Sequence, residues 1–453
     1  MARSKINYIH LPTEVLQYIF SLTKRRWHEF ALEPNSKLPN FAVVCKAWLP
    51  AARLALYSDL YLYRDDDEDE DKTQDETLEQ LKETLVANPL LADLVLSINF
   101  APPNGYSPEG TELVAEIITL CPHVSRLHIQ GWNDDSLPKL RSAVAGAKAL
   151  EHLELFARSM DDRRCDPFWK NMGDFFHMLG NWPNARTIFL HRDMFGSTTW
   201  KNKKTKSRNP PADGVCPRLE RLAWLSGITD RALTELCRIA PNLRCLHLIN
   251  TSQLSPSTIK STVSAYAETL EYLQLGIPDK DEDEDAAGAR PYALDNVLPG
   301  LKRLRTLHAK PALLLPQTLA RGFVALEYLV LHEVKDLGPL QDAITSGLPS
   351  LKNIMVCGEY GEPAGAGEFA EGALAKFIDV CAARGVTVKR RGHGYTKVDE
   401  LAHMMDYPEE MAAEIVEKQN FGIDSERWGG SGMSDEFDTD GSDLDTDDES
   451  DYE

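Results

Sequence analysis

The sequence predicts an α/β protein: a curved solenoid with parallel strands inside and helices outside, preceded by a short helical module. Two observations predict this fold. A phrase of the form L-x-x-L-x-L returns ten times between residues 91 and 356, with starts 22 to 35 residues apart. Internal repetition at this spacing is typical of solenoids. Amphipathic stretches with helical spacing separate the copies. Hydrophobic residues make up 43% of the 453 positions, enough to bury a continuous core.

The repeated phrase has the alternation of a strand with one buried face, and its first Leu is a further inward anchor. The copies are LADLVL from Leu91, VSRLHI from Val124, LEHLEL from Leu150, ARTIFL from Ala185, LERLAW from Leu219, LRCLHL from Leu243, LEYLQL from Leu270, LRTLHA from Leu304, LEYLVL from Leu326 and LKNIMV from Leu351. Their starts are 22 to 35 residues apart. YSDLYL from Tyr57 and VTVKRR from Val386 read as degenerate end copies.

The segments between the phrases read as helices. In PSTIKSTVSAYAETL, for example, Ile259, Val263 and Tyr266 follow helical spacing. A proline often precedes the phrase, where it ends a helix and favours an extended chain; these are Pro122, Pro183, Pro217, Pro241 and Pro349. The pattern resembles the leucine-rich repeat family over residues 57–392. An ordinary α/β domain with a parallel sheet is the alternative, since it also alternates buried strands with helices.

Residues 1–56 do not fit the repeat and are predicted to form a separate helical module. Leu11-Pro12-Thr13-Glu14 opens a helix, with proline at an early position where its missing N–H is harmless. Val15, Leu16, Ile19 and Phe20 then form an apolar stripe, and a second helix follows in FAVVCKAWLPAARLAL. So few residues cannot bury these stripes alone, and something must cover them.

The same residues resemble the F-box family, whose pattern runs L-P-x-E-[LV]-L-x-x-I-[LF] and later V-C-[KR]-x-W. The matching positions are Leu11, Pro12, Glu14, Val15, Leu16, Ile19 and Phe20, then Val44, Cys45, Lys46 and Trp48. The segment between the helices, residues 23–40, is longer and more polar than in that pattern.

The F-box resemblance implies docking on the S-phase-kinase-associated adaptor (here "the adaptor") and cullin of an SCF-type cullin–RING ubiquitin ligase. It implies that the repeats behind the module select a protein target. The residues that it assigns to adaptor binding are Leu11, Pro12, Glu14, Val15, Leu16, Ile19, Phe20, Val44 and Trp48. The alternative is that these side chains pack on the first repeats and cap the solenoid, since a solenoid end needs a cap.

The variable positions of the phrase are predicted to line the concave face of the solenoid. Aromatic and arginine side chains there are the types that anchor protein interfaces. The candidate target-binding residues are His128, His152, Phe156, Phe189, His191, Arg221, His247, Tyr272, His308, Tyr328 and His332. The alternative is that these positions are merely solvated. Histidines on neighbouring strands are close enough in principle to bind a metal, but no HxH or HExxH motif supports a metal site, and nothing in the sequence supports a pH response.

Composition excludes several classes of protein. The net charge is −21, and three acidic segments carry −24 between them: 64–76, 279–285 and 424–453. The remaining chain is near +3, without the concentrated basic face that nucleic-acid binding needs. No run of apolar residues is long enough for a membrane span, and the start lacks the pattern of a signal peptide. Eight scattered cysteines without CxxC pairs indicate free thiols, and we expect a cytoplasmic or nuclear protein.

Five further segments stand apart from the repeat. Residues 64–76 and 279–285 are predicted acidic insertions, 393–428 a helical extension, and 429–453 a disordered acidic tail. In the tail, Ser442, Thr446 and Ser450 each precede an acid by three positions, which suits an acid-directed kinase; the alternative is a solubilising tail. The basic run 201–208 is either a solvated loop or a nuclear-localisation patch.

No motif for catalysis, phosphate binding or a cofactor is present in the sequence. We therefore predict no catalytic residues, no metal and no cofactor. The predicted function is that of a non-catalytic substrate-recognition subunit of an SCF-type ubiquitin ligase. The first alternative is an F-box and leucine-rich-repeat scaffold that binds a partner without ubiquitylating it. The second is a hydrolase or transferase hidden in an α/β body.

Overall fold

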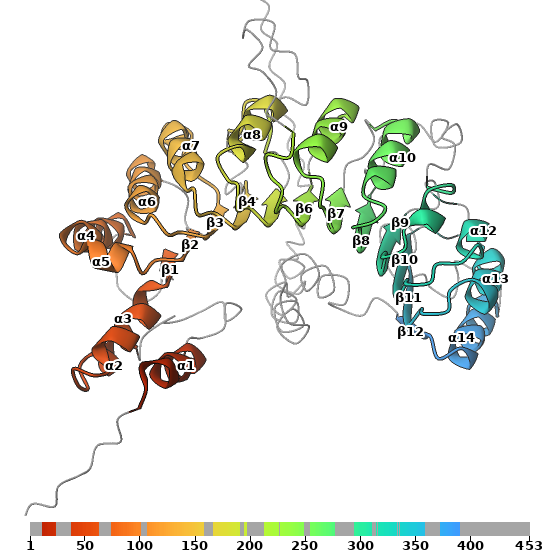
Figure 1. Ribbon diagram of the computed structural model, residues 1–453, viewed down its shortest axis with the longest axis horizontal. Coiled ribbons are helices and arrows are strands. Elements are labelled where there is room, and N and C mark those ends of the chain that lie inside the picture. The colour runs from red at the N-terminus through yellow and green to blue at the C-terminus, as the bar shows by residue number, and fades with distance from the viewer. Residues whose placement is uncertain are drawn as a thin grey trace, which may run out of the picture.

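The repeats form one long, curved parallel sheet. The computed structural model describes residues 11–23, 38–62, 74–100, 107–157, 166–190, 194–196, 213–225, 227–248, 254–276, 294–309, 314, 316–332, 334, 336–357 and 372–389. Its strands follow one another in chain order from β1 to β12, and every neighbouring pair is parallel. Figure 1 shows an arch with the strands on the inner side and the helices on the outer side.

The strands are short, as a tightly repeating solenoid requires. They are β1 Asp59–Leu62, β2 Ser97–Phe100, β3 Arg126–Gln130, β4 His152–Phe156, β5 Thr187–Leu190, β6 Arg221–Trp224, β7 Cys245–Leu248, β8 Tyr272–Leu275, β9 Thr306–Ala309, β10 Tyr328–His332, β11 Asn353–Cys357 and β12 Thr387–Lys389. The outer helices are α4 Gln74–Ala87, α5 Pro89–Ala92, α6 Pro108–Leu120, α7 Leu137–Gly146, α8 Met172–Leu179, α9 Asp230–Ile239, α10 Pro256–Ala265, α12 Pro316–Leu319, α13 Gly338–Ser346 and α14 Ala373–Ala383, with a 3₁₀ turn at Leu298–Gly300.

This topology confirms the predicted solenoid and rules out the ordinary α/β alternative. A doubly wound sheet reverses its strand order at a switch point and carries helices on both faces. Here each strand pairs only with the strands of the preceding and following repeats. The core lies between the sheet and the outer helices, and contains the regularly spaced leucines, such as Leu153, Leu222 and Leu273.

Most repeated phrases begin two residues before a strand, but the first one does not. Leu91 and Ala92 lie in α5, and the strand begins only at Ser97. The prediction of a strand phrase from Leu91 is therefore wrong by four residues, because LADLVL and the following VLSINF overlap and both fit the pattern. Pro89 at the start of α5 favours a helix at Leu91 and Ala92, since proline suits a first helical turn.

Short polar side chains fix where the outer helices begin. Ser107 accepts a hydrogen bond from the backbone N–H of Gly110 at 2.7 Å, and Ser255 accepts one from Thr258 at 3.2 Å. Each serine is followed by a proline at the first helical position. This combination satisfies an otherwise unpaired N–H and presets the helical backbone.

Aromatic side chains fill the core beside the longest repeats. Trp169 packs edge-on against Phe175 with ring centroids 4.8 Å apart, and Phe195 stacks on Trp224 at 4.9 Å. The starts of the phrases on either side, at Leu150, Ala185 and Leu219, are 35 and 34 residues apart. Large rings supply the extra buried volume that these longer repeats require.

An alternating row of charges, here called the edge ladder, runs along the amino-terminal ends of the strands. It consists of Glu151, Arg186, Glu220, Arg244, Glu271, Arg305, Glu327 and Lys352, and each backbone N–H after the first donates to the carbonyl of the preceding member at 2.7–2.9 Å. The side chains also pair: Glu327 lies 2.7 Å from both Arg305 and Lys352. Opposite charges in adjacent repeats favour the register in which they meet.

Several predicted features lie outside the described residues. These are most of the acidic segment 64–76, the segments 201–208, 279–285, 393–428 and 429–453, and the sites Ser442, Thr446 and Ser450. At the end of the first segment, Asp75 and Glu76 belong to α4, and Ser107 donates a hydrogen bond of 2.7 Å to Asp75.

Candidate functional site

The amino-terminal helices form a small unit with its own core. Helices α1 Thr13–Thr23, α2 Leu38–Ala42 and α3 Leu49–Tyr57 pack around Leu16 and Phe20, which meet the small alanines of α3. The ring of Phe20 stacks on Phe41 at 4.8 Å and lies 5.6 Å from Trp48. This core is separate from that of the solenoid, and α3 leads directly to β1 (Figure 1).

The predicted adaptor-binding residues divide into an interior set and an exposed set. Leu16 and Phe20 are buried, while Leu11 and Trp48 are half-buried against them. Pro12, Glu14, Val15, Ile19 and Val44 are exposed.

The exposed set includes apolar side chains of the module, here together called the module face. It comprises Val15 at 41% exposure, Ile19 at 39% and Val44 at 56%, together with Tyr18 and Val43. The solenoid leaves these side chains exposed, so they do not cap it in this structure. Tyr18 and Val43 were missed in the sequence because neither belongs to the conserved positions of the F-box pattern.

Strand pairing places the variable positions of successive repeats side by side. In the first column, Arg126 pairs with His152, followed by Thr187, Arg221 and Cys245 across β3 to β7. The second column brings His128, Glu154 and Phe189 together, and the third pairs Gln130 with Phe156. His191 lies outside the described residues, and for His332 only its place at the end of β10 is described.

The part of the concave face built by β3 to β5 is accessible. Arg126 is exposed, and His128, His152, Phe156 and Phe189 are half-buried. A chain of hydrogen bonds orders this region, because His128 Nδ1 lies 2.7 Å from Glu154 Oε2 and its Nε2 lies 2.7 Å from Gln130 Nε2. The carboxylate and the amide hold the imidazole ring in a fixed orientation.

Further along the arch, the concave side chains are closed off from solvent. His247 and His308 are 3% exposed and Tyr272 is 1% exposed, so these predicted target-binding residues present almost no surface. Tyr272 packs 5.4 Å from the His308 ring and donates a hydrogen bond to Gln274. Neighbouring strands on an inward-curving sheet are about 4.8 Å apart, which crowds large side chains against one another. Arg221 and Tyr328, in contrast, are half-buried.

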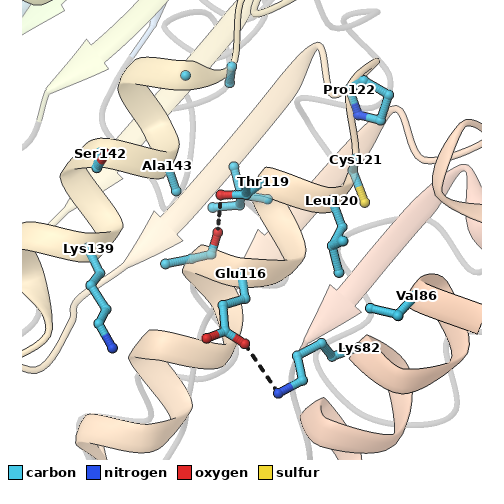
Figure 2. A pocket seen from close by; sticks show the side chains of 14 residues that line it. Lys82, Val86, Glu116, Thr119, Leu120, Cys121, Pro122, Lys139, Ser142 and Ala143 are labelled. Atoms are coloured by element: carbon cyan, nitrogen blue, oxygen red, sulfur yellow. Dashed lines mark hydrogen bonds and ion pairs between the residues drawn. The ribbon is translucent and has the colours of Figure 1, made fainter. Parts of the chain in front are cut away.

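A groove of about 630 Å³ lies on the helical side, between α4, α6 and α7. Figure 2 shows its lining, where Lys82 forms an ion pair with Glu116 at 3.2 Å and Thr119 bonds back to its own helix. Burial, with a smaller contribution from Asp93, raises the pKa of the Cys121 thiol in this lining to about 12. This thiol therefore stays protonated at neutral pH and is a poor nucleophile.

Neither a metal cluster nor a membrane-spanning helix is found among the described residues. Within the described ranges, no three or more His, Cys, Asp or Glu side chains gather as a metal site would require. No helix in that part of the chain is long and apolar enough to cross a membrane. The cysteines described there are free thiols, and Cys121, Cys216, Cys245 and Cys381 are buried.

The class of protein defined by this geometry is the leucine-rich-repeat solenoid, here with a helical module at its amino-terminal end. No family model matches the chain, and no curated protein matches it. Among solved structures, it is similar to the leucine-rich repeat-containing protein LegL7 from Legionella pneumophila, at 11% identity and a TM-score of 0.35, over 78% of this chain and 96% of that one. It is also similar to a chain of the Rad7 and Elc1 complex in yeast, at 15% identity and a TM-score of 0.41, over 84% and 93%.

Proposed function

We propose that this protein is a non-catalytic substrate-recognition subunit of an SCF-type ubiquitin ligase. In this proposal the module face docks on the adaptor and the solenoid binds a protein target. The observation that carries the proposal is the exposure of Val15, Ile19 and Val44 on a module whose interior is already filled. Apolar side chains left exposed on α1 and in the turn after α2 are typical of a surface that a partner covers. Their positions in the F-box pattern name the adaptor as that partner.

The arrangement of the module supports this role in physical terms. Leu16, Phe20 and Trp48 hold α1 and α3 together, which leaves the outward side chains at fixed positions. A rigid surface loses little conformational freedom on binding. The protein then contributes to ubiquitin transfer by proximity, because it holds the target near the enzyme that transfers ubiquitin.

The proposal is tested by co-expression with the adaptor, followed by size-exclusion chromatography. We expect the natural chain to co-elute with the adaptor. A double variant, Val15→Asp with Ile19→Asp, should elute alone, because binding to the adaptor would require two carboxylates to be buried in the contact. Val324→Asp is the matched control, since this valine is 78% exposed and lies on the solenoid.

Thermal melts establish that each variant is folded. Co-elution of the folded Val15→Asp, Ile19→Asp variant, or failure of the natural chain to co-elute, would overturn the proposal. Leu16 and Trp48 are unsuitable for this test because changes there disturb the interior of the module. The scaffold alternative predicts adaptor binding without any change in the abundance of the bound partner when the module face is mutated.

A further inference from the structure

The concave face contains a row with two arginines, here called the first-column cluster: Arg126, His152, Thr187 and Arg221. The pairing of β3 to β6 sets these residues side by side. Each step between strands is about 4.8 Å, so the backbones of the two arginines lie about 14 Å apart, with His152 and Thr187 between them. On a chain with a net charge of −21, two arginines in one row of the inner face are a local exception.

The charges around His152 support this grouping. Burial first, and then the positive charges of Arg126, Arg221 and Arg186, lower the pKa of His152, while Glu151 acts in the opposite direction. Arg126 is exposed and forms no ion pair with the part of the chain that the structure describes. In that part of the chain, the nearby carboxylates Glu151 and Glu220 belong to the edge ladder, on either side of Arg186. The four positions of the row carry no carboxylate; Asp59 lies in the same column two strands before Arg126, Glu154 on the inner face pairs with His128, and Arg221 contacts the Cys245 thiol.

A buried hydroxyl lies in the middle of the row. Thr187 is 1% exposed, and its Oγ1 has no hydrogen-bond partner among the described residues. Strand alternation places it on the inner face, because Ile188 after it points into the core. A buried polar group without a partner is unfavourable, and native proteins rarely keep one without a reason. A carboxylate that reaches this hydroxyl would accept its hydrogen bond.

Aromatic side chains adjoin the row. Phe189 is two residues beyond Thr187, Phe156 is at the end of β4, and both are half-buried on the inner face. Beyond them the inner face is closed at His247, Tyr272 and His308. Arg126, His152 and Arg221 and the rings of Phe156 and Phe189 are therefore the accessible or half-buried side chains of the inner face at β3 to β6, around the buried Thr187.

We propose that the first-column cluster binds an acidic, extended segment of a partner protein, with carboxylates on Arg126 and Arg221 and an apolar side chain on Phe189. This deepens the proposed function, on which it rests, by naming the class of target. An extended chain advances about 3.4 Å per residue, so Asp or Glu side chains about four residues apart span the two arginines. Planar guanidinium groups favour carboxylates because they donate two parallel hydrogen bonds. Two separate arginines suit two carboxylates better than they suit a single phosphate.

The test is selection of a phage-displayed library of random dodecapeptides on the purified full chain. We expect selected peptides to contain paired Asp or Glu residues about four positions apart and an apolar residue. For a synthetic selected peptide, Arg126→Glu should raise the dissociation constant about tenfold or more, since charge-assisted hydrogen bonds are lost. Arg321→Glu makes the same charge change at an exposed site after α12, and should leave binding unchanged.

Thr187→Val separates recognition from folding. It removes the hydroxyl at nearly constant shape, so it should raise the melting temperature while weakening peptide binding. Selected peptides without acidic enrichment, equal binding to Arg126→Glu, or binding only after Asp and Glu are replaced by phosphoserine would each overturn the proposal. Adaptor co-elution of the Arg126→Glu variant reports on the proposed function separately, and we expect it to be unaffected.

Discussion

At the scale of single residues, the apolar stripe of α1 has two different roles. Val15, Leu16, Ile19 and Phe20 look equivalent in the sequence, and their spacing correctly predicts one helix. Leu16 and Phe20 point to α3, whereas Val15 and Ile19 are rotated by about 100° and stay exposed. Sequence spacing does not reveal which half is interior, because that depends on where α3 lies.

This division predicts how truncations in α1 affect stability. Phe20→Ala removes a buried ring that contacts Phe41 and Trp48, and should destabilise the module by about 3–5 kcal/mol. Val15→Ala changes an exposed side chain and should alter stability by about 0.5 kcal/mol at most. Hydrogen exchange of the α1 amides measures both effects. Equal protection of α1 in the two variants would contradict the assignment of interior and exposed residues.

Glu327 provides a prediction about pH. Burial favours its neutral form, but hydrogen bonds and charges from Lys352 and Arg305 outweigh burial and lower the pKa of the Glu327 carboxyl. A pKa that is lower in the folded state adds stability above the unfolded-state value of about 4.5, and this stability is lost as the pH falls through the folded-state pKa. Melting temperatures of the natural chain and Glu327→Gln should therefore differ at pH 7, and the difference should begin to shrink as the pH falls below about 4.5. A difference that is constant over this range would show that the carboxylate does not contribute as described.

At the scale of elements, the repeated phrase predicts the strands well, and it fails where local context competes with it. Nine of the ten predicted phrases lead into a strand two residues after their start, and the exception at Leu91 is helical because of Pro89. The columns of the concave face follow from the same register. The burial of His247, Tyr272 and His308 does not follow, because it depends on how closely the side chains of adjacent repeats crowd together.

The edge ladder yields a prediction at this scale. Arg305→Glu places a like charge beside Glu327 and Glu271 and should destabilise the solenoid by about 0.5–1 kcal/mol, which is modest because these groups are partly exposed. Adding Glu327→Arg restores the Arg305–Glu327 pairing in reverse, but it sets like charges against Lys352. The double variant should therefore recover only part of the lost stability. The triple variant that also carries Lys352→Glu should recover more. Urea denaturation measures these differences. Equal stability of the single and the triple variant would mean that the ladder does not couple the repeats.

At the scale of the whole molecule, both candidate interaction surfaces lie in the amino-terminal half of the arch. The module face precedes β1 (Figure 1), and the first-column cluster lies on β3 to β6. The sequence predicts the order of module and solenoid, because the F-box pattern of residues 11–48 precedes the repeated L-x-x-L-x-L phrase. It does not predict which part of the inner face is open. A target held at β3 to β6 would lie close to the adaptor-binding end, as proximity-driven transfer requires.

The central claim, that the module face is the adaptor-binding surface, is tested most directly by hydrogen exchange on the purified full chain with and without the adaptor. We expect the adaptor to slow exchange in α1, in α2 and at Val43 and Val44, and to leave β3 to β11 unchanged. Protection of the concave strands without protection of α1, or no protection anywhere at saturating adaptor, would contradict the claim.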